Sequence, residues 1–190
     1  MNIHQLSVSY QAEHDRILVQ LNTQAAEVLR LWITRRMAIN LFPRLTQLVA
    51  SEEARKLPLS NQDEMSRNTL MEFKKQESIS QADFKTPFKT EARAFPLGPE
   101  PLLITVVTLH PAGNGLLRIG FDEKLANTPN PRGFQVTMDP PLLHNFLHLL
   151  ESSIKASEWG LLHTSKPATA DPTTLTGEGS PTTPPPQYLN

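Results

Sequence analysis

Apolar and polar side chains alternate three times in the first fifty residues. Apolar residues at every second position turn one face of a strand toward a core and leave the other in solvent, as in an antiparallel meander. Polar stretches at 11–15 and 22–27 separate the three runs and suit hairpin loops. The inward-facing positions of the three predicted strands are Leu6, Val8 and Tyr10, then Ile17, Val19 and Leu21, then Leu29, Leu31 and Ile33.

The period changes to that of a helix after Thr34, which we predict to be the N-cap because its hydroxyl can accept a hydrogen bond from the first turn. Apolar residues then recur every three or four positions, at Ala38, Leu41, Phe42, Leu45 and Val49. Pro43 lies inside this helix and is predicted to kink or restart it, because its ring removes a donor and clashes with the preceding turn. Residues 1–50 thus form a predicted strand, strand, strand, helix unit.

The same order of elements returns after residue 98, with Asp139 as the predicted N-cap of the second helix. The third strand, the cap and the helix align with those of the first unit at a constant offset of 105, taking residue 29 to 134 and 49 to 154. We interpret the match as an internal duplication, although chance patterning is an open alternative. Predicted inward positions of the second unit are Ile104, Val106, Thr108, Leu117, Ile119, Phe121, Phe134, Val136 and Met138, followed by helical Leu143, Phe146, Leu147, Leu150 and Ile154.

These patterns predict an α+β fold. Each unit has one apolar sheet face and one helix, so the units at 1–50 and 99–163 should share one core of antiparallel sheets and packed helices. Residues 51–98 carry eight Lys or Arg and eight Asp or Glu, which indicates a charged linker with a polar helix near 62–82 and a further strand at 92–97. Residues 164–190 are rich in Pro, Thr and Gly, which is typical of a disordered tail.

Composition narrows the classes of function. Cysteine is absent, which excludes disulfides, a thiolate nucleophile and cysteine metal ligands. The net charge of −1 argues against a protein that coats nucleic acid through bulk positive charge. No stretch approaches the roughly 18 apolar residues of a spanning helix, and no basic start precedes an apolar run. We therefore expect a cytoplasmic protein without membrane contact.

His144, His148 and Glu151 are candidate metal ligands on the second helix. Their spacing of four and three residues lets two imidazoles and a carboxylate share one helix face. The alternative interpretation is a solvated face opposite the apolar positions of the same helix. A metal-dependent enzyme is the third functional hypothesis, and it depends on these three residues.

Arg35 and Arg36 follow the predicted cap directly, where two positive charges meet the positive end of a helix dipole. They could hold an anion together with the free backbone amides, or they could pair with Glu27 or with a linker carboxylate. Arg30 and Trp32 lie on the polar face of the preceding strand. Trp32 is either an exposed stacking platform or a residue covered by the linker helix, and the second interpretation is favoured. These four residues make a candidate anion-binding or ligand-binding surface.

The segment Leu29-Arg-Leu-Trp-Ile-Thr-Arg-Arg36, followed by Leu41-Phe-Pro, resembles a pattern found in bacterial proteins with no assigned function. That resemblance covers about a quarter of the chain and implies no activity. Tandem strand-rich units that each end in a helix also resemble, at the level of the fold, the Pur and Whirly single-stranded nucleic-acid binders. This second resemblance implies a nucleic-acid-binding sheet.

Short catalytic motifs are absent: the chain has no glycine-rich phosphate loop, no G-x-S-x-G turn and no H-E-x-x-H helix. The leading hypothesis is a non-enzymatic interaction or adaptor protein without a cofactor, which binds a protein partner or a second copy of itself. The alternative is a single-stranded nucleic-acid binder that uses Arg30, Trp32, Arg35 and Arg36.

Overall fold

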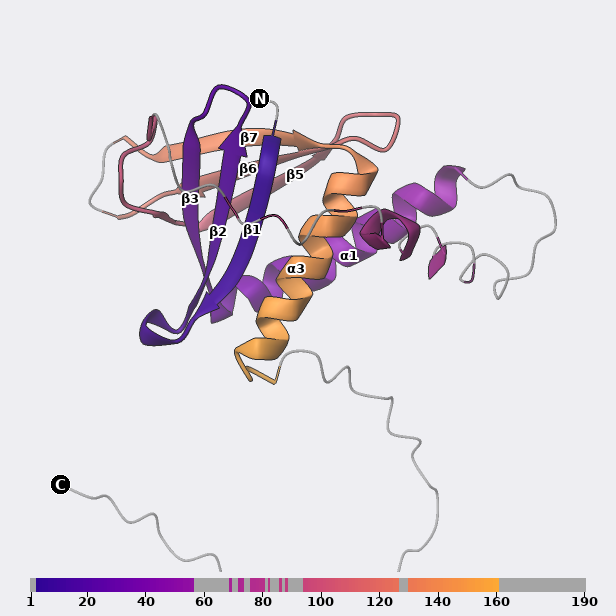
Figure 1. Cartoon of the computed structure of the whole chain (residues 1–190), viewed down its shortest axis with the longest axis horizontal. Helices are drawn as coiled ribbons and strands as arrows, with labels where there is room; N and C mark the ends of the chain where they lie inside the picture. The colour runs from indigo at the N-terminus through magenta and orange to yellow at the C-terminus, as the bar shows by residue number, and fades with distance from the viewer. Residues whose placement is uncertain are drawn as a thin grey trace, which may run out of the picture.

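A computed structural model describes residues 3–56, 94–126 and 130–160, with 69, 72–73, 76–80, 82, 86 and 88 between them. Two sheets and two long helices make up an α+β fold, as predicted (Figure 1). The predicted tail at 164–190 lies outside the described residues. The elements are β1 (Ile3–Gln11), the 3₁₀ turn η1 (Ala12–His14), β2 (Arg16–Thr23), β3 (Val28–Thr34), α1 (Arg35–Lys56), β4 (Leu102–Leu103), β5 (Val106–Pro111), β6 (Leu117–Glu123), β7 (Arg132–Met138) and α3 (Pro140–Ala156).

The first sheet has the strand order β1-β2-β3-β4. Strands β1, β2 and β3 form an antiparallel meander in which Val8 lies opposite Val19, and Val19 lies opposite Leu31. This register brings the predicted apolar positions onto one face, where those of β2 and β3 are buried. The predicted alternation is therefore confirmed for all three strands. Strand β4 joins the sheet from the second unit and runs parallel to β3.

The second sheet has the order β5-β6-β7, and its two pairings are antiparallel. The predicted inward phase of β6 and β7 is confirmed, but that of the first strand is wrong. Val107 and Leu109 pack against the core, whereas Val106 and Thr108 face the other way, opposite Asp122 and Gly120. The reason is that residues 104–105 belong to neither strand: the chain leaves the first sheet after β4 and enters the second at β5, and different alternate positions face inward in the two sheets.

Both predicted N-caps are confirmed. The amide of Met37 donates to Oγ1 of Thr34 at 3.2 Å, and the amide of Leu142 donates to Oδ1 of Asp139 at 2.9 Å. Helix α1 continues without a break through Pro43 to Lys56, beyond the predicted end of the first unit at residue 50. The predicted restart is therefore wrong. The lost bond falls on the solvent side of the helix, because Ile39, four residues before Pro43, is 47% exposed.

The linker is described only in part. Its described residues 69, 72–73 and 76–80 are helical, in agreement with the predicted polar helix, and the rest of that helix lies outside the described residues. In the predicted strand at 92–97, Ala94 forms a single parallel bridge with Glu27. The chain then turns, and the amide of Gly98 donates to the carbonyl of Phe95 at 2.9 Å.

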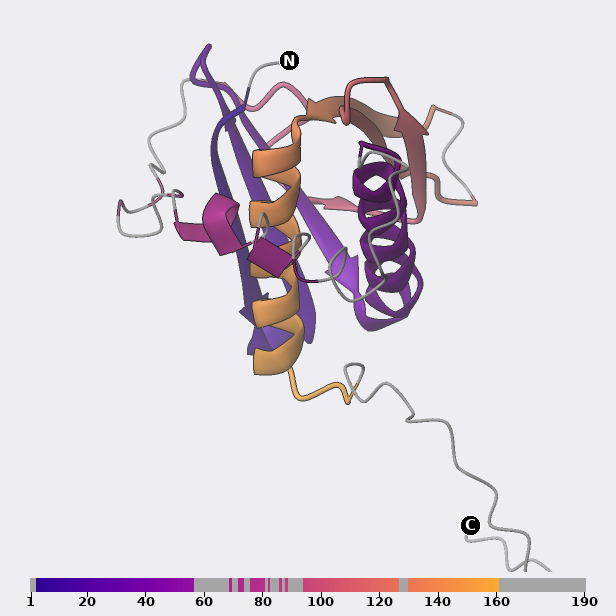
Figure 2. The same ribbon diagram turned by 90° about the vertical axis from the view of Figure 1, so that its right-hand side faces the viewer.

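Helix α3 of the second unit packs across β1 of the first sheet, whereas α1 contacts β3 of its own unit and α3. Figure 2 shows that α1 also lies beside the second sheet. The buried apolar residues of both sheets and both helices form one continuous cluster. The shared core is therefore confirmed, and its apolar sheet faces are covered by helices from both units.

The N-cap of α3 can be tested by substitution of Asp139. We expect Asp139→Ala to lower the free energy of unfolding by about 1 kcal/mol, because the amide of Leu142 loses its acceptor. Asp139→Asn keeps an acceptor and should remain within about 0.5 kcal/mol of the wild type. Urea unfolding of both variants measures the difference. Equal losses in the two variants would show that the cap is not the cause.

Candidate functional site

The chain crosses from the first sheet to the second over residues 103–105, between β4 and β5. All three backbone amides of this crossover are hydrogen-bonded. That of Leu103 donates to Oε1 of Glu123 at 2.8 Å, that of Ile104 to the carbonyl of Trp32 at 3.2 Å, and that of Thr105 to the carbonyl of Asp122 at 3.0 Å. The hydroxyl of Thr105 also accepts from the amide of Lys124 at 2.8 Å. The crossover is therefore tied to β3 and to the end of β6.

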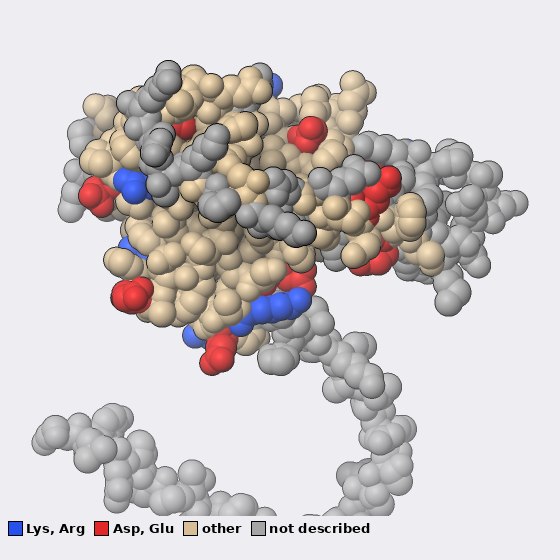
Figure 3. Space-filling view, in the orientation of Figure 1, with Lys and Arg blue, Asp and Glu red and all other residues tan. Residues whose placement is uncertain are grey.

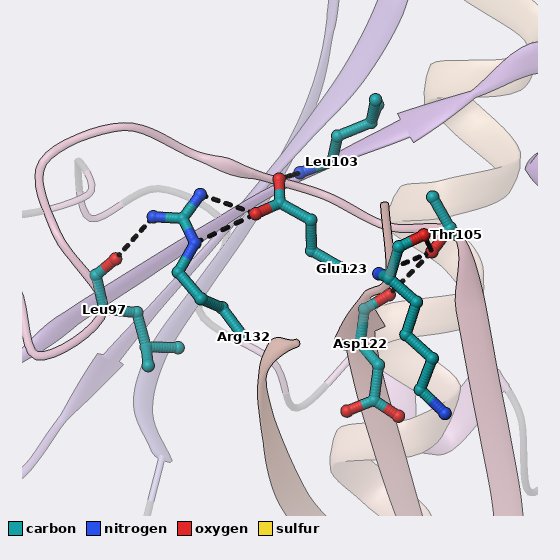
Figure 4. Close-up of polar contacts among 7 residues, drawn as sticks. Leu97, Leu103, Thr105, Asp122, Glu123 and Arg132 are labelled. Atoms are coloured by element: carbon teal, nitrogen blue, oxygen red, sulfur yellow. Dashed lines mark hydrogen bonds and ion pairs between the residues drawn. The ribbon is translucent and has the colours of Figure 1, made fainter. Parts of the chain in front are cut away.

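Glu123 is the centre of these contacts (Figure 4). The residue is only 8% exposed, and the second oxygen of its carboxylate accepts from Nε and Nη2 of Arg132 at 2.9 and 2.6 Å. Arg132 also donates to the carbonyl of Leu97 at 3.2 Å. Burial raises the pKa of Glu123, but the Leu103 amide and the Arg132 guanidinium outweigh it and hold the pKa below its usual value. The carboxylate is therefore kept charged beneath the crossover.

A groove of about 680 Å³ lies between the first half of α1 and this crossover. Its helical wall presents an outer row of exposed polar side chains, Arg36, Asn40 and Arg44, and an inner apolar row, Met37 and Leu41. Its other wall consists of residues 103–107 and Leu109. The groove is apolar at its base and basic at one rim, and no Asp, Glu or His is among the described residues that line it.

The two predicted helix-terminal arginines have different contacts. Nη2 of Arg35 donates to the carbonyl of Trp159 at 3.1 Å, whereas Arg36 lines the groove. Neither arginine pairs with Glu27, whose carboxylate instead accepts from the hydroxyl of Thr23 at 3.4 Å. The sequence therefore pointed to one groove residue, Arg36. It also grouped Arg35 with Arg36, although the Arg35 guanidinium bonds to the Trp159 carbonyl instead.

Arg35 belongs to a polar contact between the end of α3 and the turn after β1. The indole N–H of Trp159 and the hydroxyl of Tyr10 both donate to Oδ1 of Asp15, at 2.7 and 2.9 Å. The Tyr10 and Trp159 rings meet edge to face, with centroids 5.7 Å apart. These two hydrogen bonds, aided by the nearby charge of Arg35, lower the pKa of Asp15. The contact holds α3 against the first sheet.

Arg30 and Trp32 lie on the outer face of the first sheet, each with a contact of its own. Trp32 is half-buried, and the centroid of its ring lies 5.0 Å from the centroid of the His14 ring. The guanidinium of Arg30 lies 4.8 Å from the centre of the Phe95 ring. Glu72 of the described linker helix lines a pocket between α1 and α3, and most of that helix lies outside the described residues, so its predicted cover over Trp32 stays a prediction. The four residues of the predicted surface thus contact different partners.

The three predicted metal ligands lie along that pocket between the helices, which has a volume of about 360 Å³. His144 is 6% exposed, so the predicted solvated face is wrong at this position; its Nε2 lies 2.6 Å from Oε1 of Glu53 on α1. Glu151 accepts from Nζ of Lys155 at 2.7 Å. Among the described residues, no group of three or more His, Asp or Glu side chains is arranged to hold a metal ion. The metal site stays a prediction.

Charged groups on the face of the molecule drawn in Figure 3 are few, and blue and red residues lie next to one another at several places. No broad basic field of the kind that attracts nucleic acid is visible on that face. Within the described part of the chain, no helix is long and apolar enough to cross a membrane.

No family model matches this chain, and neither a search of curated proteins nor one of solved structures found a match. The resemblances to bacterial proteins of unassigned function and to the Pur and Whirly folds therefore remain predictions.

The Glu123 contact predicts a pH-dependent stability. Because its pKa is lowered on folding, the carboxylate stabilises the fold above its usual pKa of 4.5, and this contribution is lost as the pH falls through the folded pKa. Glu123→Gln should therefore lower the free energy of unfolding by about 2 kcal/mol at pH 7. The difference from the wild type should shrink as the pH falls below 4.5, and urea unfolding across this range measures it.

Asp122→Asn is the matched control, because its side chain lies on the opposite face of β6. It should change stability by less than about 0.5 kcal/mol at pH 7. A Glu123→Gln penalty that stays constant between pH 7 and pH 3 would contradict the assigned role of the carboxylate.

Proposed function

We propose that this chain is a non-enzymatic adaptor that binds a polypeptide segment of a partner protein in the groove between α1 and the crossover at 103–105. The observation that carries the proposal is the groove itself, an apolar trough next to the edge strand β5. Its volume of about 680 Å³ falls within the usual range for binding sites, about 300 to 1,000 Å³.

The position of β5 supports a polypeptide as the ligand. Among the described strands, β5 pairs only with β6, so alternate N–H and C=O groups along its other edge point away from the sheet. Such an edge is a template for a further strand, and addition of a strand is a common way to bind an extended segment. Half-buried Val107 and Leu109 and the apolar row of α1 would receive its side chains.

The chemistry of the lining favours binding over catalysis. General acid–base catalysis uses a group that can gain or lose a proton near neutral pH, such as His, Asp or Glu. The groove has two arginines and an asparagine as its main polar side chains, and guanidinium groups stay protonated. Positioning and electrostatic recognition are therefore the functions that these side chains can perform.

The nucleic-acid alternative has less support. It requires Arg30, Trp32, Arg35 and Arg36 to act on one surface, but Arg35 is bonded to the Trp159 carbonyl and Arg36 lines the groove. The ring of Trp32 is already in contact with His14, so it is not a fully open stacking platform.

Selection of random 12-residue peptides on the immobilised full-length chain tests the proposed function. We expect the selected peptides to lose at least tenfold in affinity for Asn40→Trp, because a bulky ring at this exposed position fills the groove. Thr137→Trp, at an exposed position on the outer face of β7, should bind them as the wild type does.

Two results would overturn the adaptor proposal. One is that no peptide is enriched on the wild type, and the other is that the selected peptides bind both tryptophan variants equally well. A labelled single-stranded DNA of mixed sequence, tested in parallel at low salt, should not bind. Salt-sensitive DNA binding that is lost in Arg30→Ala would instead establish the nucleic-acid alternative.

A further inference from the structure

We infer that the groove recognises an extended acidic segment, which adds to β5 as a strand and places carboxylates four residues apart against Arg36 and Arg44. This inference depends on the proposed function and specifies its ligand. It rests on three features of the groove: its charge, its spacing and its open strand edge.

The charge of the groove is one-sided. Arg36 and Arg44 are both exposed at the same rim, and within the described residues neither guanidinium has an ion-pair partner. Among the described residues, no acidic side chain lines the groove, so no described carboxylate balances the two positive charges there. Carboxylates of a ligand would balance the two arginine charges, and a guanidinium can bind both oxygens of a carboxylate at once. An acidic ligand is therefore complementary, and a basic one would be repelled.

The spacing along α1 sets the positions of the acidic residues. Arg36, Asn40 and Arg44 are four residues apart, so they form one row along the helix. Eight residues of helix span about 12 Å. In an extended strand, four residues span about 13 Å and return to the same face. An acidic residue at position i and another at i+4 of the ligand therefore match the two arginines.

Between the two charges, the ligand residue at i+2 lies over Asn40 and the inner row of Met37 and Leu41. A residue with an apolar stem is suited to this position. Residues i+1 and i+3 project to the other face of the added strand, where the lining sets no requirement. The recognised pattern is therefore acidic, any, apolar, any, acidic.

The open edge of β5 distinguishes a peptide from other acidic ligands. A single-stranded nucleic acid would need aromatic side chains for stacking, and none of the described residues that line the groove is aromatic. Free main-chain groups on β5 instead match the N–H and C=O groups of another strand. We therefore commit to a polypeptide and treat nucleic acid and a second copy of this chain as outcomes of the test.

The test uses nine-residue fluorescent peptides and the full-length chain, with anisotropy measured at low salt. The reference peptide has two aspartates four residues apart and valine midway between them. Three matched peptides carry lysine in place of aspartate, aspartates only three residues apart, or methyl groups on alternate backbone amides. We expect each of these changes to weaken binding at least tenfold, because they reverse the charge, separate the carboxylates onto two faces, or remove main-chain donors.

Charge reversal of the protein completes the test. Arg36→Glu combined with Arg44→Glu should remove binding of the aspartate peptide and create binding of the lysine peptide. Arg118→Glu, an exposed arginine on the outer face of β6, is the matched control and should leave the aspartate peptide unaffected. Circular dichroism of each variant checks that the fold is retained.

The outcomes separate the inference from the proposed function. If peptides from random selection bind the groove but the aspartate and lysine peptides bind equally, the inference fails and the adaptor function stands. Undiminished binding after amide methylation would overturn the added strand. A dimer in light scattering that the double charge reversal converts to a monomer would assign the groove to a second copy. Failure of every peptide to bind, both the designed set and those from random selection, would overturn both proposals.

Discussion

The buried carboxylate of Glu123 connects the two sheets. It accepts from the amide of Leu103 on the first sheet and from Arg132 on the second, and Arg132 extends the connection to the carbonyl of Leu97. The carboxylate is buried but the Arg132 side chain is 46% exposed, so losing the contact should lower the free energy of unfolding by about 2 kcal/mol, the value for a charged hydrogen bond. Because Leu103 begins the wall of the groove, the same contact that joins the units also shapes the proposed binding site.

The groove lies where the chain changes sheets. Helix α3 packs on β1 of the first sheet, and the chain from β4 to β5 passes from the first sheet to the second beside α1. That passage needs only three residues, which leaves the edge of β5 unpaired among the described strands. The arrangement that completes the core therefore also creates an open edge facing a basic helix.

The sequence predicted the elements well because their causes are local. Alternation fixed the strands, and the side chains of Thr34 and Asp139 fixed the helix starts. The crossover was not predictable, since the phase change at Thr105 depends on which sheet accepts each segment. Arg36 could be singled out because it lies in the first turn of the helix. Asn40 and Arg44 could not, because they line the groove only through the chain segment that faces them in the folded protein. His144 appeared exposed because its partner, Glu53, comes from the other helix.

Amide hydrogen exchange at residues 103–105 tests most directly whether Glu123 holds the crossover. We expect slow exchange of all three amides in the wild type, because each has an acceptor. In Glu123→Ala, these amides should exchange at least tenfold faster, while the Val136 amide in β7 stays protected. Fast exchange in the wild type, or unchanged protection in the variant, would contradict the central role of this carboxylate.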